Sequence, residues 1–500
     1  MARVFYVECA GEIWREVAQA CAARAGWIPV LWTGAADDEQ PVRTLFPEVE
    51  FFSGPDAALN LIRPSWPVSA APQDSQALAQ SEAIAVQMMD RMDAGGSFAP
   101  EERRRHYREL LRVWAGALDH FRPERVVFSI APHIVFDYVL YALCRQRCVP
   151  TLMFERHGLP GWVFTLDAID VPSPALQRAL GRSRAGTTLP ADYAQWLRGL
   201  SAGAATAMPA NFRKKLALYK VDSAVAGGSM LRGAAFELKR ALVLLARHGL
   251  QGPRNSYLRS SRPPHGRARW LETECARFEG LSRKRRLAAE LGRLARGPVP
   301  GEPYVLMALH YQPERSTVPM GGAFGDQRLA VELLARALPQ GWWLYVKEHP
   351  WQLQPFGRGE MQRDMDYYRE LVRHANVRLL PLEADTSALI DGARAVATIS
   401  GSVGWQAMCR GIPALVFGEA WYRACEGAFR LRSEDDTRSA FAAIASGYRA
   451  ERAAVERFAA ALAEVCVPGV LEPGIENVQG LDTQIAAQAM AGALIGHAAS

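Results

Sequence analysis

The stretch from Ala395 to Gly418, AVATISGSVGWQAMCRGIPALVFG, constrains the fold of this chain more than any other. Two short apolar runs, 395–399 and 414–417, flank a turn of small residues and a short helical segment that ends at Cys409. Two such runs bridged by a helical turn form a β-α-β unit, which requires a parallel sheet.

The turn in this unit contains Ser400, Gly401 and Ser402. The first N–H groups of the helix that follows have no partners within the helix, and anions bind there because the helix dipole favours negative charge. The sequence therefore predicts a phosphate site at this turn. A simple capped helix is the alternative, because Ser and Gly are common at helix starts in any case.

The same alternation of strands and helices occurs in two separate parts of the chain. With 500 residues, the chain exceeds the roughly 250–300 residues at which a single core stops growing. We therefore expect an α/β fold with two parallel-sheet domains, separated by a helical segment at 173–300 that lacks strand signals. Apolar runs predict strands at 3–8, 28–32, 125–130 and 151–154 in the first domain, and at 304–309, 343–347, 377–380, 395–399 and 414–417 in the second.

Bulk properties favour a cytoplasmic protein. The N-terminus, MARVFYVECAGEIW, begins directly with a strand pattern and not with the apolar core of a signal peptide. The longest aliphatic runs fall far short of the roughly 20 residues that span a membrane. The eight cysteines are scattered without a paired CxxC set, which predicts reduced structural thiols.

Positive charge is concentrated between Asn211 and Arg269. This segment has 13 Lys and Arg against 2 Asp and Glu, a local net charge of +11 in a chain whose total is +6. The amphipathic run 231–250 within it fits the anionic surface of a membrane, so the protein is expected to be cytoplasmic or peripheral at the inner membrane. The alternative is a helix that packs on the core and has a solvated rim. The segment lacks interleaved aromatic residues and any docking motif, so nucleic-acid binding is not expected.

Polar and titratable residues follow several of the predicted strands. Because ligands of open parallel sheets bind beyond the carboxyl ends of the strands, these residues are expected to share one cleft. In the first domain they are Glu155 and His157; in the second they are Gln312, Glu314, Arg315, Lys347, His349, Ser400, Gly401, Ser402 and Glu419.

The residue types suggest a division of roles. A nucleotide leaving group gains negative charge as its bond to a sugar breaks, and the turn at 400–402 would supply hydrogen-bond donors to it. His349 or Lys347 would be the accompanying cation, and His349 is favoured because a strand-end lysine usually faces solvent. Glu155 and His157 would supply a base or nucleophile from the opposite domain. No HxxxH or DxD spacing indicates a required metal ion.

Three runs in the second half resemble bacterial capsule and surface-polysaccharide biosynthesis proteins: ALHYQPERSTVPMGGAFGDQ, LYVKEHP and ATISGSVGWQAMCRGIPALVFG. The resemblance covers about 304–422 and implies the GT-B fold of glycosyltransferases, two facing Rossmann-like domains. His349-Pro350 is similar to the His-Pro motif whose histidine meets the donor phosphate in capsular Kdo and sialic-acid transferases. Where many such proteins have Glu-Ala in the helix after the turn, this chain has Gln406-Ala407, so an amide would contact the ribose.

These observations together predict a metal-independent glycosyltransferase without a cofactor, which moves a sugar from a CMP- or UDP-linked donor to a growing capsule or surface polysaccharide. A sugar-nucleotide epimerase of the same fold and a non-catalytic capsule assembly or glycan-binding protein are the alternatives. The expected catalytic residues are Glu155, His157 and His349; the expected nucleotide-sugar ligands are Gln312, Glu314, Arg315, Lys347, Ser400, Gly401, Ser402, Gln406 and Glu419. The expected segments are an acceptor domain at 1–172, a basic helical insertion at 173–300, a nucleotide-sugar domain at 301–430 and C-terminal helices at 431–500 that cross back to the first domain.

Overall fold

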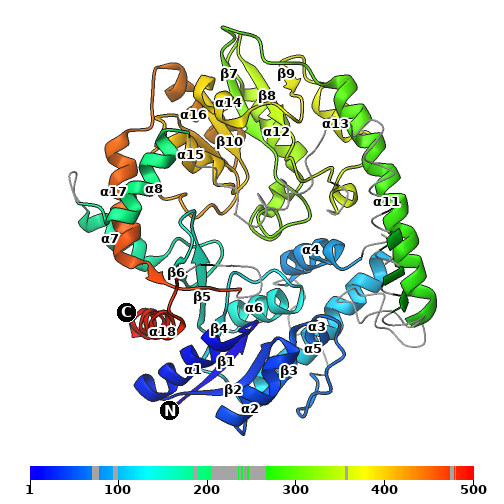
Figure 1. Cartoon of the computed structure of the whole chain (residues 1–500), viewed down its shortest axis with the longest axis vertical. Helices are drawn as coiled ribbons and strands as arrows, with labels where there is room; N and C mark the ends of the chain where they lie inside the picture. The colour runs from blue at the N-terminus through cyan, green and yellow to red at the C-terminus, as the bar shows by residue number, and fades with distance from the viewer. Residues whose placement is uncertain are drawn as a thin grey trace.

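The computed structural model describes residues 1–69, 78–93, 99–183, 188–203, 266–354, 358–472 and 480–499, together with a few isolated positions between them. Two separate β-sheets with helices around them form the two halves of the molecule (Figure 1). This confirms the predicted α/β fold class with two sheet domains. The basic segment 211–269, including the amphipathic run 231–250, lies almost entirely outside the described residues.

The first sheet has seven strands in the order β13-β6-β5-β4-β1-β2-β3. Strands β1 to β5 pair in parallel, and their central residues are buried on both faces, as expected for a sheet covered by helices. The strands are β1 (Ala2–Val7), β2 (Trp27–Gly34), β3 (Glu50–Ser53), β4 (Arg125–Phe128), β5 (Thr151–Arg156), β6 (Trp162–Leu166) and β13 (Val467–Pro468). The associated helices are α1 (Glu12–Ala25), η1 (Ala36–Asp38), α2 (Glu39–Leu45), α3 (Gly54–Ala58), α4 (Ala79–Met88), η2 (Met89–Arg91), α5 (Pro100–Phe121) and α6 (Phe136–Gln146).

The expectation that this sheet is parallel throughout is wrong at one edge. Strand β6 pairs antiparallel with β5, and β13 pairs antiparallel with β6. Strand β6 follows β5 after a five-residue turn, which is too short for the helical crossover that a parallel connection needs.

The second sheet has six strands in the order β12-β11-β10-β7-β8-β9, and all its pairs are parallel. Helix α12 begins at a turn where Asp326 accepts the Arg328 N–H, and Ser433 caps α16 in a capping box. The strands are β7 (Tyr304–Ala308), β8 (Trp343–Lys347), β9 (Val377–Leu379), β10 (Ala395–Thr398), β11 (Ala414–Val416) and β12 (Ala428–Arg430). The helices are η5 (Gly322–Gly325), α12 (Gln327–Ala337), η6 (Gly359–Gln362), α13 (Tyr367–Leu371), α14 (Thr386–Gly392), α15 (Val403–Cys409) and α16 (Glu434–Ala445).

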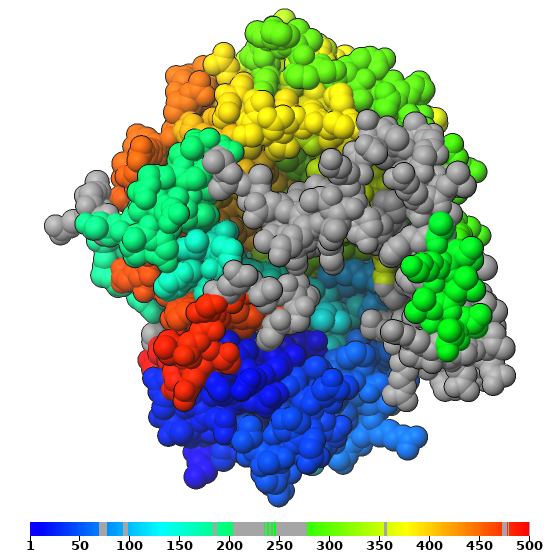
Figure 2. Space-filling model, viewed as in Figure 1, coloured from blue at the N-terminus to red at the C-terminus, as the bar shows by residue number. Residues whose placement is uncertain are grey.

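Helices on both sides of the molecule connect the halves. Helix α11 (Gly266–Leu294) runs along one side, and α7 (Pro174–Arg182), α8 (Ala191–Ser201) and α17 (Arg452–Val465) lie together on the other (Figure 1). The C-terminal helix α18 (Thr483–Ala499) returns to the first domain and packs against α1. Figure 2 shows this helix in red against the blue N-terminal residues.

The loops at the carboxyl ends of the strands make the polar contacts between the halves. Arg315, after β7, forms a two-pronged ion pair with Glu155 at the end of β5, with N–O distances of 2.9 and 3.0 Å. Arg91 in η2 donates hydrogen bonds to the carbonyls of His133 and Val318, one in each half. The carboxyl ends of both sheets therefore face a common boundary, which we call the inter-domain boundary.

Candidate functional site

Strand order places one topological switch point in each sheet. In the second sheet, β8 lies on one side of β7 and β10 on the other; in the first sheet, β2 and β4 lie on opposite sides of β1. Ligands of open α/β sheets bind outside the strand ends at such points, because the loops diverge there. The residues after β7 and β10 and those after β1 and β4 are therefore the first places to look for a site.

His310 occupies the switch point of the second sheet, between the ends of β7 and β10. Its Nε2 accepts the Ser400 N–H at 3.2 Å and lies 2.9 Å from the Thr398 hydroxyl. Burial, with a further contribution from His349 and Arg363, lowers the pKa of His310 to about 3, so the ring is neutral. The Gly401 Cα lies close to this ring: a Cβ there would come within 3.1 Å of Nε2.

The expectation of free donors at the Ser400–Ser402 turn is wrong for its first two residues. The Ser400 N–H is used by His310, its hydroxyl donates to the Ser316 carbonyl at 2.6 Å, and the Gly401 N–H donates to Thr398 Oγ1 at 3.2 Å. Ser402 and Gln406 are half-buried on α15 and remain candidates for ligand contact.

A buried polar network stabilises the loops after β7 and β8. The fully buried Arg363 forms an ion pair with Glu348 at 2.8 Å and donates to Gln312 Oε1 at 2.7 Å. Gln312 also donates to the Gly325 carbonyl, so its amide is engaged within the domain. This residue was expected to bind the nucleotide-sugar, and the structure instead gives it a role in holding the loop.

His349 directly follows Glu348 of this network, and its Nε2 has no hydrogen-bond partner among the residues that the structure describes. Its Nδ1 accepts the Trp351 N–H at 3.1 Å, so the ring proton of the neutral form resides on Nε2. The side chain is half-exposed. Burial, with the charges of Lys347 and Arg363, lowers the pKa of His349 to about 4. The expected cation is therefore a neutral hydrogen-bond donor.

Lys347 and Glu419, both expected at the nucleotide, make contacts within the second domain. Lys347 is buried and donates to the Leu382 carbonyl at 3.1 Å, and burial lowers its pKa. Glu419 forms ion pairs with Arg430 at 2.8 Å and Arg423 at 2.9 Å.

Glu314 is half-buried at the boundary and accepts a hydrogen bond from Ser316 at 3.3 Å. Burial raises the pKa of this carboxyl, and the nearby Arg91 and Arg315 oppose the rise. Glu314 therefore remains a candidate ligand group at the boundary.

The two catalytic residues expected in the first domain, Glu155 and His157, have different surroundings in the structure. Glu155 is at the boundary, but Arg315 occupies both of its oxygens. His157 lies in an aromatic cluster with Tyr193, Trp196 and Trp421, the last of which is in the loop after β11. Its Nδ1 accepts the Leu159 N–H, its Nε2 lies 3.1 Å from the Tyr193 hydroxyl, and burial lowers its pKa to about 3. This geometry favours a structural role for His157.

Three residues at the boundary were not identified from the sequence: Glu8, Arg91 and His133. Glu8 directly follows β1, and His133 lies in the loop after β4, so both flank the switch point of the first sheet. Applying the strand-end rule to the run VFYV would have identified Glu8. Arg91 lies in a stretch with only a weak helical pattern, and no sequence signal indicates its place.

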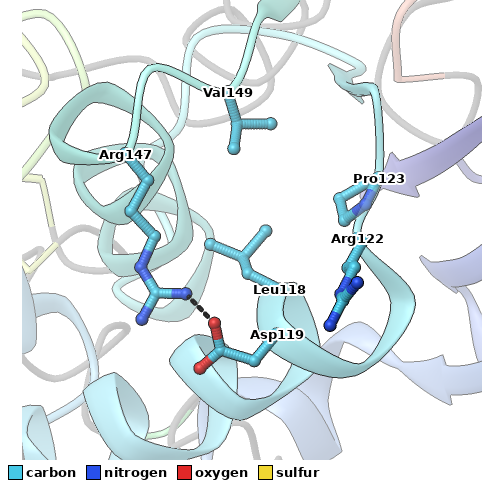
Figure 3. A pocket seen from close by; sticks show the side chains of 6 residues that line it. All are labelled: Leu118, Asp119, Arg122, Pro123, Arg147 and Val149. Carbon is cyan, nitrogen blue, oxygen red and sulfur yellow. Dashed lines mark hydrogen bonds and ion pairs between the residues drawn. The ribbon is translucent and has the colours of Figure 1, made fainter.

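A pocket of about 500 Å³ lies at the opposite edge of the first sheet (Figure 3). Its walls come from the loops that precede β4 and β5, and Arg147 pairs with Asp119 across it at 2.7 Å. The pocket lies at the amino ends of these strands, whereas parallel sheets bind ligands at the carboxyl ends. The lining residues are Leu118, Asp119, Arg122, Pro123, Arg147 and Val149.

Within the described ranges, no group of three His, Cys, Asp or Glu side chains is placed to hold a metal ion. A membrane-crossing helix is likewise absent from the part of the chain that the structure describes, because no helix there is both long and apolar enough.

Comparison with known proteins gives one family match. Residues 282–445 match the family model described as capsule polysaccharide biosynthesis protein, a range that contains the whole second sheet. No curated protein matches the chain.

The chain is also similar to solved structures, at low identity. One is KpsC of Thermosulfurimonas dismutans, a beta Kdo 2,7 transferase, with 11% identity, a TM-score of 0.31, and coverage of 76% of this chain and 87% of that chain. Another is the UDP-GlcNAc 2-epimerase from Neisseria meningitidis bound to UDP-GlcNAc, with 11% identity, a TM-score of 0.22 and coverage of 99% of both chains. The family match therefore shows a similarity to capsule polysaccharide biosynthesis proteins over residues 282–445, about a third of the chain.

Proposed function

We propose that this protein is a glycosyltransferase that moves a sugar from a CMP- or UDP-linked donor to a growing capsule or surface polysaccharide. The family match supports a role in capsule biosynthesis. Two sheets whose switch points border one boundary provide a donor side and an acceptor side, which is the arrangement that a two-substrate transfer needs.

The observation that carries the proposal is the geometry of His349. The Trp351 N–H fixes the ring tautomer, and the ring lies next to a buried ion pair that holds its loop. Nε2–H is therefore an oriented donor at a strand end. Such a preoriented donor stabilises the charge that develops on a phosphate oxygen when the bond to the sugar breaks, without reorganisation cost at that moment. Ser402 and Gln406, on the neighbouring α15, would contact the remainder of the nucleotide.

The experiment is calorimetry of the full chain against a panel of CMP- and UDP-sugars, followed by a transfer assay with the sugars that bind. His349→Ala is expected to weaken nucleotide-sugar binding by roughly 10- to 150-fold, because a hydrogen bond to a charged group contributes about 1.5–3 kcal/mol. His374→Ala is the matched control: His374 is half-buried in the same domain and precedes the amino end of β9, whereas His349 follows the carboxyl end of β8. Equal affinity of the two variants would contradict the assignment of His349.

A non-catalytic glycan-binding protein is the second candidate. The ion pair between Glu155 and Arg315 favours it, because the carboxylate expected to act on the acceptor is occupied. A wild-type protein that binds nucleotide-sugars and neither transfers nor hydrolyses them would support this candidate and contradict the transferase.

A further inference from the structure

Glu8 lies at the switch point of the first sheet, where β1 ends between β4 and β2. The end of β5 touches the second domain through the ion pair of Glu155 with Arg315. The loop after β4 is linked to it through Arg91 of η2, which donates to the carbonyls of both His133 and Val318. Glu8 is half-exposed at this edge. It therefore faces the inter-domain boundary from the side opposite His349.

The backbone around Glu8 is built to hold its carboxyl group in one place. Glu8 has a φ of 56°, a left-handed conformation that is uncommon for a residue other than glycine. Its N–H donates to the Thr33 hydroxyl at 2.9 Å, and that hydroxyl lies 3.4 Å from Oε1. The carboxyl rests on Gly54 at the start of α3, where a Cβ would come within 2.3 Å of Oε1. Any larger residue at position 54 would displace it.

Several carboxyls at this boundary are paired with an arginine, whereas Glu8 and Glu314 form no ion pair with the described residues. Glu155 pairs with Arg315, Glu348 with Arg363, and Glu472 with Arg156. Among the described residues, no ion pair involves Glu8. The charged groups that act on it are the carboxyl of Asp137, from α6, and that of Glu472, from the segment after β13.

We propose that Glu8 is the general base that removes the proton from the acceptor hydroxyl during sugar transfer; this inference rests on the glycosyltransferase function proposed above. A half-exposed, fixed carboxylate without a counter-ion, at a switch point that faces the donor domain, can receive a proton from a bound hydroxyl. Glu155 cannot do so while Arg315 holds both its oxygens. Asp137 is engaged by the N–H groups of His133, Ile134 and Tyr138.

The step balances in atoms and charge. The acceptor oxygen forms a bond to the anomeric carbon as its O–H proton passes to the Glu8 carboxylate. The bond from the anomeric carbon to the phosphate oxygen breaks, and its electron pair leaves on the nucleotide. Glu8 then returns its proton to solvent, so that the enzyme is unchanged at the end of the cycle.

The environment of Glu8 suits this role. Burial and the carboxylates of Asp137 and Glu472 raise the pKa of Glu8 to about 8, and the Thr33 hydroxyl opposes the rise. A base is most effective when its pKa lies near the working pH. Because Glu8 must lose its proton before it can act, the rate is expected to rise with pH and to level off above about pH 8.

The test uses the full chain and the nucleotide-sugar identified by the calorimetric panel. Glu8→Gln keeps the size of the side chain and removes its ability to take a proton. We expect this variant to bind the nucleotide-sugar as the wild type does and to transfer sugar about 10²- to 10⁴-fold more slowly, without the rise of kcat/KM toward pH 8. Asp56→Asn is the matched control: this half-buried carboxyl lies on α3, next to the same Gly54, and its loss should leave both rate and pH profile unchanged.

The outcomes are distinct. A Glu8→Gln variant with the wild-type rate or pH profile overturns the role of Glu8 and leaves the transferase intact. A wild type that binds the donor without transfer overturns both. If Glu8→Gln does not fold, Glu8→Asp decides: its shorter carboxylate should lower kcat and shift the pH midpoint while donor affinity is kept, and a wild-type rate and profile would overturn the proposal.

Discussion

The carboxyl ends of the two sheets use their polar side chains in opposite ways. In the second domain, Gln312, Glu348 and Arg363 are buried and bonded to one another, and only a few groups, such as His349 Nε2, are left for a ligand. In the first domain, Glu8 borders the boundary and forms no ion pair with the described residues. The bonded side chains of the second domain thus form a fixed frame, whereas Glu8 of the first domain is a carboxyl that can change protonation.

The largest expected effect comes from breaking the frame. Arg363→Met would leave Glu348 buried without its partner, and such a loss costs about 3–5 kcal/mol of folding free energy. Thermal or denaturant unfolding measures it. Arg369→Met, on the adjacent α13, removes an arginine whose side chain is 55% exposed and pairs with Glu290 and Asp366, and should change stability far less. Equal destabilisation by the two variants would show that the buried network is not the frame.

A smaller effect is expected where the first domain meets this frame. Glu155→Gln leaves the buried Arg315 with a neutral partner that still accepts one hydrogen bond, at a cost on the order of 2 kcal/mol. We also expect Glu155→Gln to keep its affinity for the nucleotide-sugar, because contacts with the donor come from the other domain. It should transfer sugar more slowly, because the ion pair that links the two domains is lost. Unfolding, calorimetry and a transfer assay measure the three results.

The control for this variant is Glu464→Gln, which removes an exposed pair with Arg182 between α17 and α7. Its unfolding midpoint should stay near that of the wild type. If Glu155→Gln unfolds at the wild-type midpoint and transfers sugar at the wild-type rate, then the ion pair with Arg315 neither joins the domains nor serves the site.

The smallest expected effect is a local change within the frame. Gly401→Ala would place a Cβ 2.8 Å from Thr398 Oγ1 and 3.1 Å from the His310 ring, and the required shift costs about 1–2 kcal/mol. Gly292→Ala is the control, because nothing lies within 4 Å of that position and alanine favours a helix. Thermal unfolding of both variants tests the difference, and a Gly401→Ala protein as stable as the Gly292→Ala protein would rule out the close contact.

Apolar periodicity predicted most of the parallel core. The strand at 343–347 has the predicted bounds, and the other strands predicted at 304–309, 377–380, 395–399 and 414–417 are present with slightly shorter bounds. Strands β6 and β13 were missed, because a two-residue edge strand such as β13 has no periodic signal and its pairing depends on residues far away in the sequence.

The sequence predicted which candidate residues follow strand ends, but it did not predict their hydrogen-bond partners. Strand-end reasoning brought His349 and Glu155 to one boundary, since the carboxyl ends of parallel strands share an edge. It could not show that Ser400, Gln312 and Lys347 donate hydrogen bonds to backbone carbonyls of the same domain, because tertiary packing determines these partners. The neutral state of His349 likewise depends on burial that no sequence pattern reveals.

Strand β13 has a consequence for the order of events during synthesis. Val467 pairs with Val163 in β6, and the Trp14 indole donates to the Leu471 carbonyl, so the first sheet receives its last strand from the end of the chain. During translation, β6 therefore lacks its neighbour β13 until the entire second domain has been synthesised. Unpaired edge strands promote aggregation. The domain that is made first is the one completed last.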